Sequence, residues 1–297
     1  MKRRYTIGKA QARAGLLFVT PSMVIFTLFV FIPLLIAFVF SFMNFDMLFN
    51  HIKFVQLRNY GRLFSDGRFW NSLVNTVYYT LGTVPLQILL SLLTAVAICR
   101  STKVHTFFKS VYFLPAICSM TIISIVWSFL IDKDIGIYTY WFSLIGIQPI
   151  ALLRDPFWAM PTIILVSIWK GFGFNMVILI AGLQGIPEPL YEAAEIDGAS
   201  GFQKFLRITI PMLMPTLSFT IVNSIIASFQ VFDQIFVMTR GGPLFKTETV
   251  VQYIYSAAID SHNMAYASTI AVILFAITFV VSISTLKRMQ TGESDLS

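Results

Sequence analysis

The chain has 297 residues, of which 57% are hydrophobic and 12% are charged, and its mean hydropathy is +0.77. An ordinary soluble domain carries about 25% charged residues, so this composition excludes a typical water-soluble protein and requires a lipid environment. The net charge of +7 is explained by membrane topology and anionic lipid. No basic patch interleaved with aromatic residues indicates a nucleic acid partner.

Six long apolar stretches follow one another along the chain. A helix needs about 20 apolar residues to cross a hydrocarbon core of about 30 Å, and each stretch is long enough. The predicted spans cover about residues 15–42, 72–99, 111–130, 157–183, 212–238 and 264–286. The first is too long for a signal peptide and should remain in the mature protein. The sequence therefore predicts an all-α integral membrane protein, with a transmembrane domain over residues 15–286.

The orientation follows from the positive charges near the span ends. The cluster before the first span consists of Lys2, Arg3, Arg4, Lys9 and Arg13. Because Lys and Arg favour the cytoplasmic side, residues 1–14 are predicted to form a cytoplasmic basic tail. An even number of spans then places residues 287–297 in the cytoplasm as well.

The cytoplasmic connection over residues 184–211 is patterned as two short helices. Pro187 or Pro189 suits the first turn of the first helix, and Gly198 suits its C-terminal end. Such a polar helical pair can be merely solvated, or it can dock a cytoplasmic protein. The pattern alone leaves both interpretations open.

The second helix of this connection has its own start and stop signals. Ser200 followed three residues later by Gln203 predicts a capping box. Pro211 is expected to end the helix before the next span, because proline cannot continue a helical hydrogen-bond ladder.

The segment from Tyr191 to Pro211 resembles the EAA loop of bacterial ABC importer permeases. That pattern reads EAA, three residues, G, nine residues, I, one residue, LP, and Ile210 replaces the leucine here. In the family this loop docks on the ATPase subunit. The resemblance assigns that role to Glu192, Ala193, Ala194, Asp197, Gly198, Ile208 and Pro211.

Further segments resemble the carbohydrate-uptake branch of the same family. They are Asn59 to Phe64 with Phe69 to Ser72, Ser167 to Gly171 with Ala181 to Pro187, and Phe232-Asp233 with Thr239 to Pro243. Together the resemblance covers about residues 15–286 and implies a type I importer permease fold with six spans. It also implies a bacterial cell membrane, a second permease of similar fold, two ATP-binding-cassette ATPase subunits and an extracytoplasmic solute-binding protein. The implied substrate is a sugar, an oligosaccharide or a similar polyol.

The sequence lacks the motifs of several kinds of enzyme. It contains no GxxxxGK[ST] phosphate loop, so ATP hydrolysis is expected on a partner. It also contains no GxSxG or HExxH motif, and Cys99 and Cys118 form no CxxC pair. We therefore predict no catalytic residue, no cofactor and no metal site.

Polar residues within predicted spans are candidates for the substrate pathway, because polar groups at lipid depth tend to face a wet cavity. The candidates are Trp169, Lys170, Asn223, Ser224, Ser228, Gln230 and Asp233. Hydroxyls and amides beside aromatic rings would suit a sugar. Alternatives remain open: Lys170 can snorkel to headgroups, Asp233 can bond to the outer turn, and the serines and Asn223 can serve helix packing.

Two other function classes compete with an importer permease. An ion-coupled secondary transporter would show inverted repeats and membrane-buried carboxylates, whereas Asp233 is the sole acidic residue well inside a predicted span. A membrane scaffold without transport is the other alternative. The EAA-like loop favours the importer permease over both.

Overall fold

The computed structural model describes residues 9–45, 52–99 and 102–294. These residues form two compact units, one made of Met1–Ser65 with Ala257–Val272 and the other of Asp66–Ser256 with Ile273–Ser297. The basic residues Lys2, Arg3 and Arg4 lie outside the described residues, as do the side chains of Lys9 and Arg13. The orientation that these charges predict therefore stays a prediction.

The first unit contains the N-terminal span and a short hairpin. Its elements are α1 (Lys9–Phe26), the π-helical turn η1 (Thr27–Phe31), α2 (Ile32–Phe40), β1 (Met43–Asn44), β2 (Lys53–Phe54), α3 (Arg58–Phe64) and the start of α14 (Met264–Ser294). The two strands are antiparallel, with Met43 opposite Phe54. None of the most apolar window of the first span is buried within the described part of the chain. That span therefore leaves its apolar side chains to lipid or another subunit.

The end of the first span is fixed by polar contacts around Ser41. The Asn59 amide donates to the carbonyl of Ser41 at 3.0 Å and to that of Met43 at 2.8 Å. The Thr269 hydroxyl donates to the Ser41 carbonyl at 3.2 Å. These bonds satisfy carbonyls that the helix end leaves without a helical partner.

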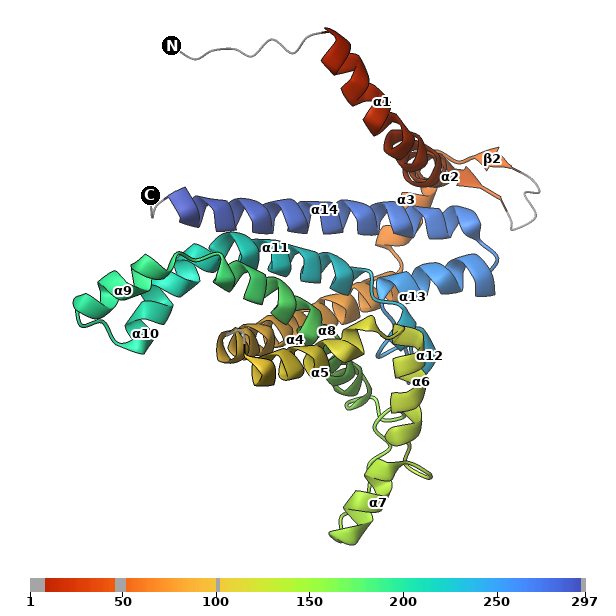
Figure 1. Ribbon diagram of the computed structural model, residues 1–297. Coiled ribbons are helices and arrows are strands. Elements are labelled where there is room, and N and C mark those ends of the chain that lie inside the picture. The colour runs from red at the N-terminus through yellow and green to blue at the C-terminus, as the bar shows by residue number, and fades with distance from the viewer. Residues whose placement is uncertain (1–8, 46–51, 100–101, 295–297) are drawn as a thin grey trace. The chain divides into compact units, whose positions relative to one another are not determined.

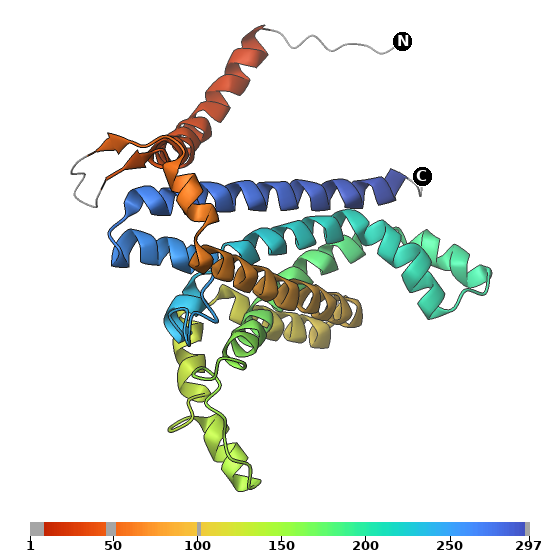
Figure 2. The same cartoon turned by 180° about the vertical axis from the view of Figure 1, so that it is seen from behind.

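The second unit is a bundle of long helices with shorter ones at its ends (Figures 1 and 2). Its elements are α4 (Gly67–Ile98), α5 (Lys103–Ile117), α6 (Met120–Leu130), α7 (Ile137–Leu144), α8 (Ala159–Gln184), α9 (Glu188–Ile196), α10 (Gly201–Lys204), η2 (Phe205–Thr209), α11 (Ile210–Phe229), α12 (Asp233–Met238), α13 (Val250–Tyr255) and the rest of α14. The turn η3 (Ser256–Asp260) begins with the last residue of the Asp66–Ser256 segment, and its other residues belong to the first unit. Helix α8 contacts α4, α5 and α11 and forms the centre of the bundle.

Glycines allow the helices around α8 to approach closely. A Cβ added at Gly173 would lie 1.9 Å from the carbonyl oxygen of Tyr112 on α5. One added at Gly182 would lie 2.7 Å from side-chain atoms of Leu213 and Thr216 on α11. Such small residues are typical of helix interfaces in membranes, where close backbone packing replaces the hydrophobic effect.

The third predicted span is broken in the structure. Helix α5 ends at Ile117, α6 begins at Met120, and their axes differ by 96°. The intervening Cys118 and Ser119 adopt extended backbone angles. The described residues thus contain five helices long and apolar enough to cross a membrane, or six if the bent pair counts as one span.

The expectation that Pro211 ends a helix was wrong. Helix α10 continues through η2 into α11, and Pro211 lies in the first turn of α11. The wide π turn explains this, because the Ile210 amide donates to the Phe205 carbonyl five residues back. The ladder has changed register before it reaches Pro211, whose missing amide is tolerated in a first helical turn.

Candidate functional site

A polar cavity of about 300 Å³ lies within the second unit. Its lining comes from α4, the α5–α6 break, α8, α11 and α12, and consists of Tyr79, Thr83, Gln87, Ala116, Met120, Ser167, Lys170, Gly171, Phe174, Asn175, Asn223, Ser224, Ala227, Ser228 and Gln234. Along α8, an apolar cluster including Met160 and Ile163 precedes these positions, and another including Met176 and Leu179 follows them. The cavity therefore separates two apolar layers.

One wall of the cavity is held by Gln234 of α12. Its amide donates to the Tyr79 hydroxyl at 2.8 Å and to the Ser167 hydroxyl at 3.2 Å. These three side chains come from α12, α4 and α8, and all three are buried. Buried amides are stable only when their hydrogen bonds are made, so Gln234 ties three walls of the cavity together.

A second cross-link joins α8 to α11. The Asn175 amide donates to the Ser224 hydroxyl at 3.0 Å, and both side chains are buried. One turn before Asn175, the cavity is lined by Gly171, and a Cβ added there would lie 2.5 Å from the Nε2 atom of Gln87. The bare backbone of Gly171 therefore makes room for the Gln87 amide.

Lys170 is the only cationic side chain in the cavity lining, which lies wholly within the described residues. It forms no ion pair with any carboxylate in the part of the chain that the structure describes. Its ammonium group is left to water, substrate or another subunit.

The cavity brings together four of the seven residues that the sequence singled out for the pathway, namely Lys170, Asn223, Ser224 and Ser228. Trp169 lies outside the lining, with its ring 5.5 Å from that of Trp127 in an edge-on contact. Gln230 and Asp233 are exposed and also outside it.

Sequence reasoning missed six of the ten polar side chains in the lining: Tyr79, Thr83, Gln87, Ser167, Asn175 and Gln234. A signal was present, because Tyr79, Thr83 and Gln87 recur every four residues in an uncharged span and therefore share a helix face. Such a polar stripe distinguishes a cavity wall from a lipid-facing surface.

The connection over residues 184–211 forms the two predicted helices. Helix α9 starts after Pro187 and ends at Ile196, and Gly198 follows with a φ of +75°. The capping box of Ser200 and Gln203 is present in full, which confirms that prediction. Of the docking residues that the resemblance assigned, Glu192, Ala193, Asp197 and Gly198 are exposed, while Ala194, Ile208 and Pro211 are half-buried.

Side-chain contacts hold α9 against the following turns. The Tyr191 and Thr209 hydroxyls are hydrogen-bonded at 2.8 Å. Lys204 donates to Glu195 at 2.5 Å, and this bond lowers the pKa of the Glu195 carboxyl. Beyond these contacts, Ile196 is 87% exposed and Phe202 is 71% exposed. The polar contacts thus hold these helices in place while the apolar side chains of Ile196 and Phe202 stay exposed.

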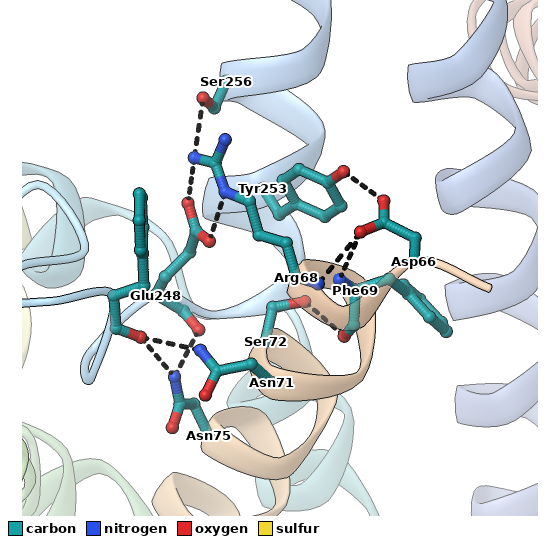
Figure 3. A network of polar contacts seen from close by, with 10 residues as sticks. Asp66, Arg68, Phe69, Asn71, Ser72, Asn75, Glu248, Tyr253 and Ser256 are labelled. Atoms are coloured by element: carbon teal, nitrogen blue, oxygen red, sulfur yellow. Dashed lines mark hydrogen bonds and ion pairs between the residues drawn. The ribbon is translucent and has the colours of Figure 1, made fainter. Parts of the chain in front are cut away.

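A further polar network joins the start of α4 to the chain before and within α13 (Figure 3). The Arg68 guanidinium donates to the Glu248 carboxylate and to the Ser256 hydroxyl. The amide of Asn75 donates to the carbonyls of Phe245 and Glu248. This network fixes the chain that follows the Gly-Gly-Pro turn at residues 241–243, a turn that the sequence marked only by resemblance.

Comparison with known proteins identifies the kind of chain to which this fold and cavity belong. Residues 60–290 match the family described as binding-protein-dependent transport system inner membrane component. The chain is 34% identical to the lactose transport system permease protein LacF of Rhizobium radiobacter, with 95% of this chain and 94% of LacF covered. It is 32% identical to the probable ABC transporter permease protein YurN of Bacillus subtilis, with 94% and 97% covered.

Solved structures show the same fold. The chain superimposes with a TM-score of 0.80 on a chain of a bacterial ABC transporter involved in the import of the acidic polysaccharide alginate. The match covers 95% of this chain and 98% of the other, at 23% sequence identity.

Proposed function

The chain belongs to the inner-membrane components of binding-protein-dependent transport systems, the permease subunits of ABC transporters, and from that premise we propose that its polar cavity is half of a sugar pathway. ATP hydrolysis takes place on a separate subunit of such a transporter. The cargo that we propose is a sugar, an oligosaccharide or a similar polyol.

The observation that carries this proposal is the chemistry of the cavity lining. Amide and hydroxyl groups of Gln87, Asn223 and Ser228 face one space from two helices, and they suit the many hydroxyls of a sugar. The aromatic side chains of Tyr79 and Phe174 lie in the same lining and can cover an apolar ring face. LacF, which shares a third of its residues with this chain over nearly its full length, is a lactose system permease.

The proposed partners follow from the family and from the exposed face of α9. Half a cavity needs a second permease of similar fold to close it. The exposed face of α9, with Glu192 and Gly198, would dock one of two ATPase subunits. A solute-binding protein would deliver the sugar from the other side of the membrane, and both termini would lie in the cytoplasm.

Reporter fusions test that topology. Fusions after Phe42 and Asn71 should report the outer side, and fusions after Ser110 and Gln184 should report the cytoplasm. An outside location for the Gln184 fusion would overturn the proposed orientation and move α9 away from any ATPase.

Uptake by reconstituted transporter tests the cavity. Asn223→Leu, Ser224→Leu and Ser228→Leu should each change the transport affinity or selectivity for sugars while the complex still assembles, because each replaces a lining polar group by an apolar one. Gln230→Leu is the matched control, since Gln230 lies on the same helix end but outside the cavity. If all three lining variants transport as well as the control, the cavity is not the pathway.

A further inference from the structure

The chain between α6 and α8 carries an arm, residues 135–153, that none of the transport roles above uses. It contains helix α7 and the segment that returns from it, and none of its 19 residues is charged. In Figure 1, α6 and α7 run across the direction of α8 rather than beside it. We propose that this arm is an interfacial anchor, whose apolar tip inserts into the lipid of the outer membrane surface.

The tip of the arm is apolar and uncovered. Ile137, Tyr140 and Trp141 are each 60% exposed, Leu144 is 59% exposed, and Ile145 is 67% exposed. No other part of the described chain buries them. Contiguous apolar surfaces of this kind mark contact sites for protein or membrane.

The hydrogen-bonding groups left over at the tip favour lipid as the occupant. The Thr139 hydroxyl donates to the carbonyls of Asp132 and Lys133, and the Ser143 hydroxyl donates to that of Tyr140. The Tyr140 hydroxyl and the Trp141 indole N–H make no hydrogen bond within the described residues. Tyr and Trp of this kind are enriched at the membrane–water interface, where one edge of the ring is apolar and the other is wet.

The residues that flank the arm on either side, which we call its stem, are charged and suit the aqueous side of such an interface. The Asp132 carboxylate accepts from the amides of Asp134 and Ile135, and this contact lowers the pKa of Asp132. The Arg154 guanidinium lies 3.7 Å from Asp132 and 3.5 Å from Asp134. Charges therefore occur on both sides of the stem and stop where the arm begins, as a chain that passes from water into lipid requires.

The length of α7 determines how such an arm can sit. Eight residues of helix extend about 12 Å at 1.5 Å per residue, which is far less than the roughly 30 Å of a hydrocarbon core. The arm therefore cannot cross the bilayer. Interfacial segments bury an apolar face about 5–10 Å deep, which this arm matches.

Anchoring would act on the cavity through α6. Leu152 and Leu153 at the base of the arm pack on the cluster that contains Ile123 and Ile131, and Met120 at the start of α6 lines the cavity. The anchor would hold the outer limb of the broken span at a fixed depth. This inference rests on the membrane location of the family, and it stands whether or not the cavity carries sugar.

Spin-label accessibility tests the proposal on the full chain in vesicles of phosphatidylcholine and phosphatidylglycerol. The native cysteines are first replaced by Cys99→Ser and Cys118→Ser, and a nitroxide is attached after Trp141→Cys or, as a second site, Tyr140→Cys. Oxygen partitions into lipid, whereas a nickel chelate supplied on both sides stays in water. Phe29→Cys in the first span is the lipid reference, and Glu188→Cys on α9 is the water reference.

The label at residue 141 should be relaxed more by oxygen than by nickel, as at Phe29 but at a shallower depth. Nickel dominance as at Glu188 would overturn the proposal, because the arm would lie in water. Shielding from both probes would also overturn it, because protein would then cover the arm. The measurement is repeated in the assembled transporter, where shielding that appears only on assembly would identify a subunit contact and likewise overturn the proposal.

Discussion

The Arg68 guanidinium donates two hydrogen bonds, at 2.9 and 2.7 Å, to the carboxylate of Glu248, which lies 180 residues later in the chain. Glu248 is only 2% exposed. The guanidinium also lies 4.5 Å from the ring centre of Phe245 and 4.9 Å from that of Tyr253. This pair therefore closes the second unit on itself, joining the start of α4 to the turn before α13 (Figure 3).

Replacing one member of this ion pair should lower the unfolding free energy more than replacing both members. Arg68→Met leaves a buried carboxylate without its cation, and we expect a loss of about 3–5 kcal/mol in unfolding free energy. The double variant Arg68→Met with Glu248→Met should recover much of that loss, because no buried charge remains. Thermal unfolding of the four proteins in detergent, followed by tryptophan fluorescence, measures the difference. Equal stability of the single and double variants would contradict this account.

Gly171→Ala should disturb the cavity through Gln87. The added Cβ would lie 2.5 Å from the Gln87 Nε2 atom, so the amide must leave its place in the lining. We expect weaker sugar transport with little change in the amount of assembled complex, measured as uptake against substrate concentration. Gly15→Ala is the matched control, since a Cβ at that helical glycine meets no atom within 4 Å.

Adding Gln87→Ala to Gly171→Ala separates two explanations. In the double variant the Cβ added at residue 171 no longer crowds the side chain at residue 87, but the Gln87 amide is missing from the cavity lining. Transport that stays impaired assigns the effect to the lost amide, whereas full recovery assigns it to steric pressure alone.

The substitutions that Gly198 tolerates should be limited by its backbone angle and not by the space around it. Its φ is +75°, yet a Cβ there meets no atom within 4 Å. Left-handed backbone costs an ordinary residue about 1–2 kcal/mol, and asparagine adopts it more readily than valine. We therefore expect Gly198→Asn to retain coupling and Gly198→Val to lose it, with uptake, ATP hydrolysis and bound ATPase measured together.

A charge reversal on the same face gives an independent test of docking. Glu192→Lys leaves the backbone unchanged and alters only an exposed side chain of α9. We expect release of the ATPase or hydrolysis without uptake. Wild-type uptake, hydrolysis and assembly in both Gly198→Val and Glu192→Lys would remove the coupling role from this loop.

The bond between Lys204 and Glu195 predicts a pH response of the loop over residues 184–211. Lys204 holds the pKa of Glu195 below its ordinary value of 4.5. A carboxyl whose pKa is lowered on folding stabilises the structure above its unfolded pKa and loses that effect as the pH falls through the folded value. Hydrogen exchange of α9 and α10, corrected for intrinsic rates, should be constant from neutral pH to about 4.5 and then rise. Glu195→Gln should abolish that rise.

Composition and motif spacing predicted the apolar helices, the helical pair within residues 184–211 and its capping box. They did not predict the break between α5 and α6, because hydropathy records how apolar a segment is and not its direction. The residues at the break, Cys118 and Ser119, are neither glycine nor proline. The nearest helix breaker, Pro115, lies inside α5.

Only four of the ten polar residues that line the cavity were predicted, for a related reason. Hydroxyl groups in these helices often bond to their own backbone four residues back, as Thr76 and Thr80 do. A threonine in a span is therefore weak evidence for a cavity until the neighbouring helices are placed. Gln234 became informative only when Tyr79 and Ser167, from two other helices, were found beside it.

The uninterrupted run from α10 through η2 into α11 gives the end of the loop over residues 184–211 and a cavity wall a common helix axis. Successive residues on such an axis are about 100° apart, and Asn223 lines both the cavity and the neighbouring apolar groove beside Phe219 and Leu286. Rotation of this helix about its axis, driven from the loop at its N-terminal end, would move Asn223 out of the cavity and into the apolar groove. Rotation of this one helix, without any separation of the helices in the bundle, would therefore be enough to change which side chains a sugar contacts in the cavity.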